Sequence, residues 1–388
     1  AMDLFDLERV EVLRGPQGTL YGKNVVGGAI NLVTRKPTDE LRASLEGTVG
    51  NYDTTNFRGF VSGPIADNVF GKLSFSTKSR DGYLNSQIAN FPEAFPNTPP
   101  ELLGQFDQLD NDSNSFRGHL RFTPTDRLEL NFTAETSRVN QSGPARYTVE
   151  GPAGRILSGL IDGDDIYKNL TGGPGRSERD ITGFMGRVDY DFDWGTFTSI
   201  TAYREADAII DVADVSQELS SLILSSPTAV AGDSNIPGAN NTFRDESEQI
   251  SQEFRLTSAG DGMFDWVGGL YFLREEITRV ESFDLGFNLS DGAGGTIQVL
   301  PPSTGSSFME NETQGYAVFG QVTWNLSDRL GITVGGRYTD EEKKADTLSV
   351  AGGFLILESF DVNAKGSWSE FTPKFAIDFQ LNDDIFFY

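Results

Sequence analysis

Connections between the expected strands alternate between short and long along most of the chain. Short turns bearing Asp, Asn, Gly and Pro recur at 63–68, 123–126, 191–195, 259–263, 326–329 and 381–384. Long polar stretches lie between them, at 81–114, 140–177, 207–242, 278–310 and 341–366. Loops of more than about 15 residues are uncommon in compact domains, yet here they occupy every second connection. A meander with short turns at one end and long loops at the other is typical of transmembrane β-barrels.

The segments between these connections alternate apolar and polar residues with a period of two, which predicts strands. On 316–324, one face is formed by Tyr316, Val318, Gly320, Val322 and Trp324. Eight steps of about 3.3 Å separate the two aromatic ends by roughly 26 Å, and a tilt of about 40° reduces this to roughly 20 Å of height. That height is close to the apolar band between the aromatic girdles of a barrel. A sandwich strand with one solvated face explains any single segment equally well, whereas the repeated loop asymmetry favours the membrane barrel.

Composition argues against several classes of function. The chain has 31 Lys+Arg against 57 Asp+Glu, a formal charge of -26, which disfavours a nucleic-acid partner. Cysteine is absent, so neither a disulfide nor a thiolate metal site can form. The one histidine, His119, falls on the polar face of its strand, and we expect it in a hydrogen-bond network of the lumen. We expect no enzymatic activity, no cofactor and no bound metal.

One spacing typical of a calcium loop occurs in Asp110, Asp112 and Asn114. Ser115 follows where the invariant glycine of such a loop belongs, and no glutamate stands at the twelfth position. A solvated acidic loop is the favoured interpretation, with calcium binding left open. The same holds for the acidic run at 162–165.

The first forty residues differ in kind from the rest. Residues 7–13 and 29–35 are predicted strands, and the segment between them is punctuated by Gly15, Gly18, Gly22, Gly27 and Gly28. Glycine at this density permits positive φ angles and close backbone approach. A compact, turn-rich unit is therefore expected at the N-terminus.

Residues 6–37, DLERVEVLRGPQGTLYGKNVVGGAINLVTRKP, resemble the C-terminal part of the plug domain of TonB-dependent receptors almost position for position. SQEFRLTS at 251–258, WVGGLYFLREE at 266–276, and the segments 316–344 and 371–388 look like successive barrel strands of the same family. The plug motif is carried by Arg14, Gly15, Pro16, Gly22, Gly27, Gly28 and Asn31.

The resemblance implies an all-β fold, an antiparallel transmembrane β-barrel with the C-terminal part of a small plug domain inside it. It divides the chain into the end of the plug, 1–39, and the first part of the barrel, 40–388. Family barrels have about 22 strands, and we count twelve here, with a thirteenth that begins at Ile385. The signal peptide, the TonB box, the first half of the plug and the closing strands of the family are not recognised. We therefore expect a partial barrel, incomplete at both ends.

The resemblance further implies TonB-dependent active transport of a scarce solute, most often a ferric siderophore, across the outer membrane of a Gram-negative bacterium. The implied partners are the TonB energy-transducing complex, outer-membrane lipid and the small-molecule cargo, whose identity the sequence does not give. Two other classes stay open. A passive porin or adhesin barrel would lack a plug, and a soluble all-β glycan-binding protein would show balanced loop lengths.

A plug inside a barrel must be held firmly and still be released, and ion pairs suit this task better than apolar packing does. We expect Arg14 or Arg35 of the plug to pair with carboxylates of the lumen, such as Glu135 or Glu253. The alternative is that these charges only line a wet lumen.

Overall fold

The structure is a computed structural model. It describes residues 6–23, 25, 27–86, 107–144, 168–169, 175–213, 229–230, 238–260, 262–290, 296–327, 329–352, 358–382 and 385–387. Nearly all of the regular structure in these ranges is β-strand, as predicted. Within them, no helix has the length and apolar character needed to cross a bilayer.

The chain begins with a small antiparallel pair of strands, which we call the N-terminal hairpin. It consists of β1 (Leu7–Arg14), the single-turn helix α1 (Gly18–Tyr21) and β2 (Gly28–Thr34).

One large sheet follows, and its first strands are β3 (Arg42–Gly50), β4 (Thr54–Ala66), β5 (Val69–Arg80), β8 (Asn111–Thr125), β9 (Leu128–Gln141), β11 (Arg176–Phe192) and β12 (Gly195–Ala213). It continues through β14 (Gly238–Ser258), β15 (Phe264–Ser290), β16 (Thr296–Ser327), β17 (Leu330–Val350), β18 (Phe360–Asn382) and β19 (Ile385–Phe387). Each strand of this path is hydrogen-bonded to the next in antiparallel register. The twelve predicted strands and the thirteenth, which begins at Ile385, are all present.

Four short strands lie outside this path: β6 (Leu84–Ser86), β7 (Asp107–Gln108), β10 (Lys168–Asn169) and β13 (Ala229–Val230). The first three form a small sheet of their own, and β13 pairs with β15.

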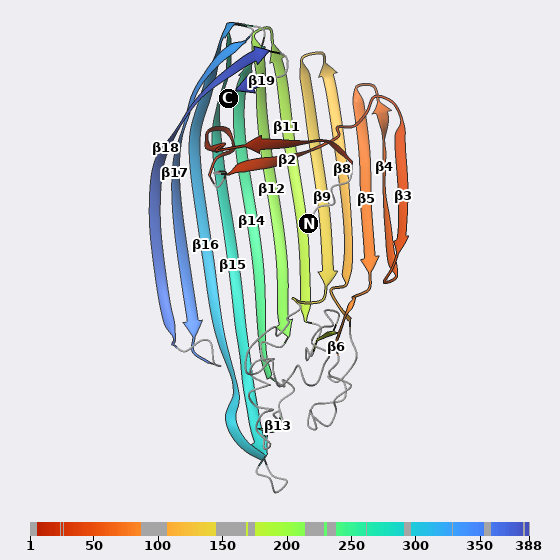
Figure 1. Ribbon diagram of the computed structural model, residues 1–388, viewed down its shortest axis with the longest axis vertical. Helices are drawn as coiled ribbons and strands as arrows, with labels where there is room; N and C mark the ends of the chain where they lie inside the picture. The colour runs from red at the N-terminus through yellow and green to blue at the C-terminus, as the bar shows by residue number, and fades with distance from the viewer. Residues whose placement is uncertain are drawn as a thin grey trace.

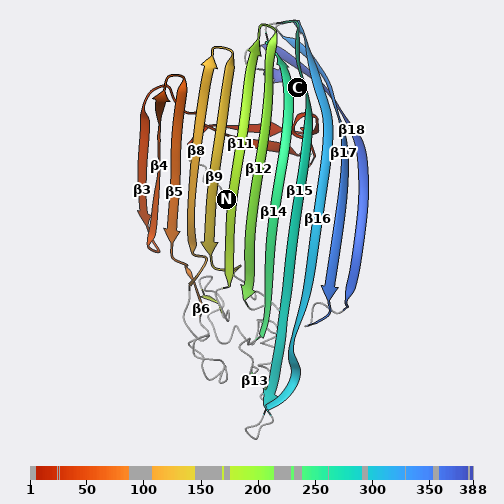
Figure 2. The ribbon, with the colours of Figure 1, turned by 180° about the vertical axis from the view of Figure 1, so that it is seen from behind.

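The large sheet is strongly curved, and the N-terminal hairpin crosses its concave side (Figure 1). Seen from behind, the hairpin lies behind the strands, so the sheet wraps around one side of it (Figure 2). Curvature of this kind follows from the right-handed twist that accumulates along a β-sheet. In the described ranges the sheet has two edges, β3 and β19.

Polar and apolar side chains of the sheet are distributed in the opposite way to those of a soluble protein. Among the described residues, fourteen polar or charged side chains are buried but only six apolar ones, while dozens of large apolar side chains are exposed. On β16, Val318 is 52% exposed, whereas its neighbour Phe319 is 5% exposed. The convex face therefore has the composition of a surface in contact with hydrocarbon, and a sandwich with a dry interior is excluded.

Aromatic side chains gather at the short-turn end of the strands. The rings of Phe192 and Trp194 stack at 5.0 Å, Trp194 and Trp266 at 6.0 Å, and Phe264 and Trp324 at 5.9 Å. The tryptophans are suited to the membrane–water interface, because the indole ring is largely apolar and its N–H is polar, and the phenylalanines stack on them. They mark one girdle, and Tyr316 at the other end of its strand's apolar row marks the second.

Candidate functional site: the N-terminal hairpin and its barrel wall

The N-terminal hairpin depends on glycines at its turn. Pairing runs from Leu7 opposite Thr34 to Arg14 opposite Gly28. The predicted motif residues Gly15, Gly22 and Gly28 have φ of +74°, +82° and +134°, a region that disfavours side chains. A Cβ on Gly28 would lie 2.3 Å from the carbonyl oxygen of Leu13, so no other residue fits there.

The other motif residues have less constrained positions. Arg14 ends β1, and its carbonyl oxygen accepts a hydrogen bond of 3.0 Å from the Gln17 side chain. Pro16 lies in the turn that leads into α1. A Cβ on Gly27 would have no atom within 4 Å.

Asn31 ties the two strands of the hairpin together through Glu11. Its Nδ2 donates to Glu11 Oε2 at 2.8 Å, and Arg9 Nε donates to the other carboxylate oxygen at 2.6 Å. The hydrogen bond from Asn31, followed by that from Arg9, lowers the pKa of Glu11 below its ordinary value.

The open end of the hairpin lies against β5. The ammonium of Lys72 forms an ion pair with Asp6, and both side chains are only 4% exposed. Lys72 Nζ also donates to the carbonyl oxygen of Arg35 at 2.7 Å, and the backbone N–H of Arg35 donates to the Asp6 carbonyl at 3.2 Å. One lysine of the wall therefore holds the residues that directly precede and follow the hairpin.

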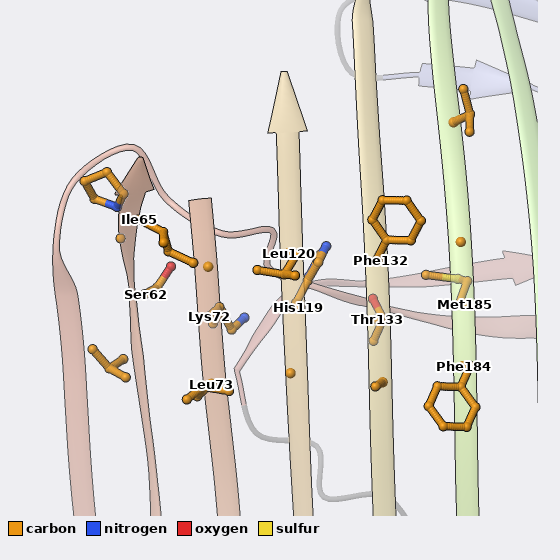
Figure 3. A pocket seen from close by; sticks show the side chains of 18 of the residues that line it. Ser62, Ile65, Lys72, Leu73, His119, Leu120, Phe132, Thr133, Phe184 and Met185 are labelled. Atoms are coloured by element: carbon orange, nitrogen blue, oxygen red, sulfur yellow. The ribbon is translucent and has the colours of Figure 1, made fainter. Parts of the chain in front are cut away.

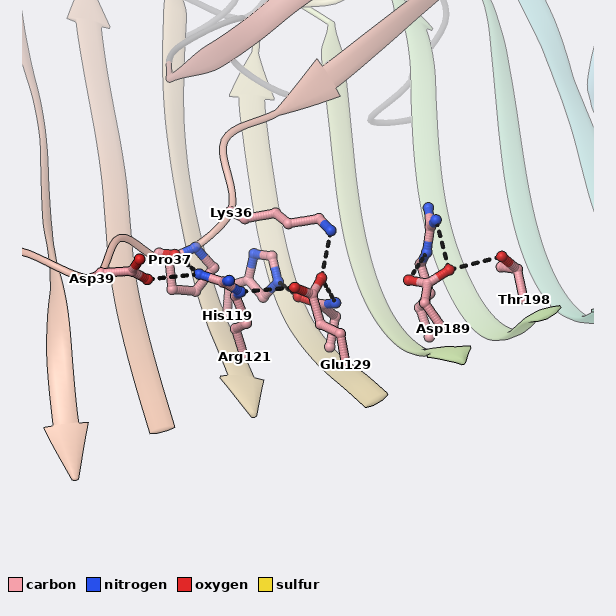
Figure 4. Close-up of polar contacts among 10 residues, drawn as sticks. Lys36, Pro37, Asp39, His119, Arg121, Glu129, Asp189 and Thr198 are labelled. Atoms are coloured by element: carbon pink, nitrogen blue, oxygen red, sulfur yellow. Dashed lines mark hydrogen bonds and ion pairs between the residues drawn. The ribbon is translucent and has the colours of Figure 1, made fainter. Parts of the chain in front are cut away.

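The segment that leads from the hairpin to β3 is attached by further polar contacts (Figure 4). Lys36 pairs with Glu129 of β9, and Arg121 of β8 donates to Asp39 at 2.9 Å and to the Pro37 carbonyl at 3.3 Å. Arg121 and Glu129 are themselves paired at 2.9 Å, so the contacts form one network across two strands and the connecting segment.

The turn end of the hairpin lies against β16, β17 and β18. Close contacts between small residues dominate: a Cβ on Gly18 would lie 3.3 Å from Thr372 Cγ2, and one on Gly335 would lie 3.3 Å from Thr19 Cγ2. Lys23 adds an ion pair with Glu341.

Gly22 faces Arg337, whose guanidinium is buried in the wall. The guanidinium lies 5.6 Å from the ring centres of Tyr271 and Phe319 and donates to Thr339 at 3.0 Å. Cation–π contacts of this kind stabilise an arginine away from water. On β17, Gly335, Arg337 and Glu341 occupy alternate positions and therefore present one row of side-chain positions to the hairpin.

Arg14 or Arg35 was expected to pair with Glu135 or Glu253, and in the structure Arg35 and the two glutamates contact other residues. Glu135 pairs with Arg117 at 3.0 Å, its direct neighbour across β8 and β9, and Glu253 lies 3.6 Å from Arg255 on its own strand. Arg35 uses its Nε to hold the Leu7 carbonyl at 3.1 Å.

Ion pairs between the N-terminal segment and the sheet do form, but through residues that sequence reasoning missed: Asp6, Lys23, Lys36, Asp39, Lys72, Arg121, Glu129 and Glu341. Lys72 shares the polar parity of β5 with Ser74, Ser76 and Lys78, so the two-residue period placed it on the lumen face but did not single it out.

His119 occupies the predicted place. It is 8% exposed on the concave side, and its Nε2 lies 3.1 Å from Asn131 Oδ1 (Figure 4). A similar network lies nearby, where Arg187 and Thr198 both donate to Asp189, at 2.7 Å each. The polar groups of the concave wall are thus largely engaged with one another.

The calcium-like spacing does not form a loop. Asp112 and Asn114 lie within β8, and Asp110 accepts a hydrogen bond of 2.6 Å from the backbone of Ser142. No cluster of three His, Cys, Asp or Glu residues suited to a metal is found in the part of the chain that the structure describes. The acidic run at 162–165 lies outside that part.

An apolar hollow of about 990 Å³ crosses β4, β5, β8, β9, β11 and β12 (Figure 3). Large side chains of the outward row line it, including Leu73, Leu120, Phe132 and Phe184, and glycines such as Gly118 leave room between them. A hollow with this lining on a membrane-facing surface is compatible with contact to lipid chains.

A curved antiparallel sheet with an apolar convex face, whose polar concave side is crossed by a glycine-rich hairpin, defines a plugged β-barrel of the outer membrane. The family model described as "TonB dependent receptor-like, beta-barrel" matches residues 48–388, and the "TonB-dependent Receptor Plug Domain" model matches residues 1–29. The chain therefore belongs to the TonB-dependent receptor family, whose members are outer-membrane proteins of Gram-negative bacteria.

Similar proteins are receptors of the same kind. The pesticin receptor of Yersinia enterocolitica is 27% identical over 386 residues, which cover 98% of this chain and 48% of that protein. The metal-pseudopaline receptor CntO of Pseudomonas aeruginosa is 47% identical over 53 residues, 14% of this chain and 8% of that protein. The ferric yersiniabactin uptake receptor FyuA from Yersinia pestis has the same fold, with a TM-score of 0.74 and 22% identity over 97% of this chain and 50% of that one. The chain thus spans about half the length of the two relatives that match nearly all of its residues.

Proposed function

We propose that the protein represented by this chain imports a ferric siderophore across the outer membrane, driven by the TonB complex. The observation that carries the proposal is the N-terminal hairpin, which lies across the concave side of the barrel and is attached to opposite parts of its wall. A passive porin has no use for a hairpin in this place, because it obstructs the lumen.

Residues 1–39 are the end of the plug and residues 40–388 the part of the barrel that surrounds it. A siderophore binds on the side of the long loops, and TonB pulls on the chain that leads into the hairpin. The obstruction then moves aside and the cargo passes, without any bond chemistry. The names of the relatives support an iron-loaded cargo, since FyuA is a ferric yersiniabactin uptake receptor and another similar structure is a ferripyoverdine receptor bound to ferripyoverdine.

The test is uptake of radioactive iron bound to candidate siderophores by cells that make the natural gene product. Uptake is expected to disappear when either the receptor gene or the TonB gene is deleted, and to return on complementation. Iron uptake that continues without TonB would contradict the proposal and favour a passive barrel.

A further inference from the structure

The contact at the open end of the hairpin differs from the other attachments by its burial. Side chains of Asp6 and Lys72 are each 4% exposed, whereas Lys23, Lys36 and Asp39, the N-terminal partners in the other three ion pairs, are 47%, 47% and 71% exposed. Exposed pairs contribute little, but the removal of one partner from a buried pair leaves an uncompensated charge. Among these attachments, the Asp6–Lys72 pair is therefore the one in which the loss of a single partner costs the most free energy.

The backbone of Asp6 is held in an unusual conformation by these contacts. Its φ is +63°, in the left-handed region that non-glycine residues adopt only occasionally. Such conformations persist where the surroundings determine them. Lys72, Ser74 at 3.5 Å and the backbone of Arg35 supply those surroundings, so Asp6 is expected to relax once it leaves Lys72.

The register of the hairpin decides how it responds to a pull. Leu7 lies opposite Thr34, so the strand that is pulled and the strand that is anchored end at the same place. Hydrogen bonds between antiparallel strands are perpendicular to the strands. A force that pulls the two adjacent strand ends apart therefore stretches the hydrogen bonds of one residue pair before it reaches those of the next pair. The force therefore acts first on the pair of Leu7 and Thr34, which lies directly beside Lys72.

We propose that the Asp6–Lys72 pair is a force-sensitive latch that controls the opening of the hairpin. This inference rests on the proposed function, in which the pull arrives through the residues before Asp6. While the pair is intact, β1 stays on β2. When it breaks, β1 separates from β2 progressively from Leu7 toward the glycine turn, while β2 remains attached through Lys36 and Asp39.

Single-molecule pulling tests the latch directly. The natural gene product, held in a lipid nanodisc, is pulled by its N-terminus against a second handle on a cysteine placed at Asp126. Residues 1–388 contain no cysteine, and any cysteine elsewhere in the gene product is first replaced by serine. A single first rupture followed by lengthening in small steps is expected. Asp6→Asn and Lys72→Met should each shorten the lifetime before the first rupture by about a hundredfold at a given force.

Matched variants separate the latch from a general loss of stability. Arg9→Met removes a cation of β1 that pairs with Glu8 and Glu11, and it should leave the first rupture unchanged. An unchanged lifetime in both Asp6→Asn and Lys72→Met would overturn the proposal. So would rupture of the whole hairpin in one step, because that outcome means shear and not unzipping.

Two engineered disulfides report the direction of opening. Val10 faces Leu32 and Leu13 faces Ala29, so both pairs can be replaced by cysteines. The Val10–Leu32 cross-link lies near the open end and should stop the extension of the pulled chain almost at once. The Leu13–Ala29 cross-link lies near the turn and should permit most of the extension. Reduction of either disulfide should release the remaining extension. Equal lengthening in the two variants would refute progressive opening. None of these measurements uses TonB or cargo, so uptake without TonB would contradict the proposed function and leave the latch measurement standing.

Discussion

Replacement of Val334 by arginine tests the placement of the sheet in the membrane. The register sets Trp324 level with Ile332 of β17 and Tyr316 level with Asp340. Position 336 is the midpoint between these two levels, and Val334 lies two residues from it. This is roughly 5 Å in height at a tilt of about 40°. An arginine so close to the bilayer midplane costs about 3 kcal/mol.

Val350→Arg is the matched control, because Val350 lies on the same strand and the same face. The two valines are 56% and 48% exposed, so the same chemical change is made at surfaces of similar exposure. Val350 lies ten residues beyond the level of Asp340, roughly 25 Å above the outer girdle, and arginine there should cost less than about 0.5 kcal/mol.

Folding of both variants of the natural gene product into fluid lipid vesicles, titrated with urea, measures the difference. The folded fraction can be followed by heat-modifiable migration on a denaturing gel. Val334→Arg should lower the folding equilibrium constant by roughly 70- to 150-fold relative to Val350→Arg. Equal effects at the two positions would refute the reasoning, because depth in the membrane is the main difference between them.

Two further predictions concern the N-terminal hairpin. Gly28→Ala should destabilise the hairpin by about 1–3 kcal/mol or more, because Gly28 has a φ of +134° and an added Cβ would collide with the Leu13 carbonyl oxygen. Gly27→Ala should be tolerated, because an added Cβ there meets no atom within 4 Å. The rate at which a protease cleaves the hairpin measures both effects. The lowered pKa of Glu11 contributes stability that is present above the pKa of an unfolded glutamate and is lost as the pH falls through the folded value. Hydrogen exchange of the hairpin in Glu11→Gln, compared with the natural protein at each pH, should differ at pH 7 and converge at acidic pH; a constant difference would contradict this role of the hydrogen bond from Asn31.

The strands, their order and the membrane-facing row could be predicted from the sequence, because each rests on local information. The two-residue period assigns Val318 and Val322 to one face before any contact is known, and the turn residues fix where each strand ends on the short-turn side. At the other end the expectation was wrong for two connections: β15 and β16 occupy most of 278–310, and β17 and β18 occupy most of 341–366, because polar residues there continue the strand pairing. The lumen position of His119 followed from the same parity. The glycine density of the first forty residues indicated that positive φ is permitted there, and Gly15, Gly22 and Gly28 adopt it.

The partners of the ion pairs could not be predicted, because parity says which face a charge occupies but not which charge lies opposite. Glu135 faces the lumen, as expected, but the register places Arg117 directly beside it. Parity placed Phe319 on the lumen face, but it did not show that the guanidinium of Arg337 lies over its ring.

The two ends of the hairpin are held by different chemistry, and this difference has a consequence for how far it opens. Close contacts of Gly18 and Thr19 with the wall act over short distances and are lost after a small displacement. The Lys23–Glu341 pair follows them along the chain, so separation that starts at Asp6 reaches this pair after β1 and α1 have been released. The latch at Lys72 therefore controls when opening begins, and the pair at Glu341 is the next point that resists it. Glycines in the turn fit this order, since they allow close seating on the wall without a side chain that must be withdrawn from it.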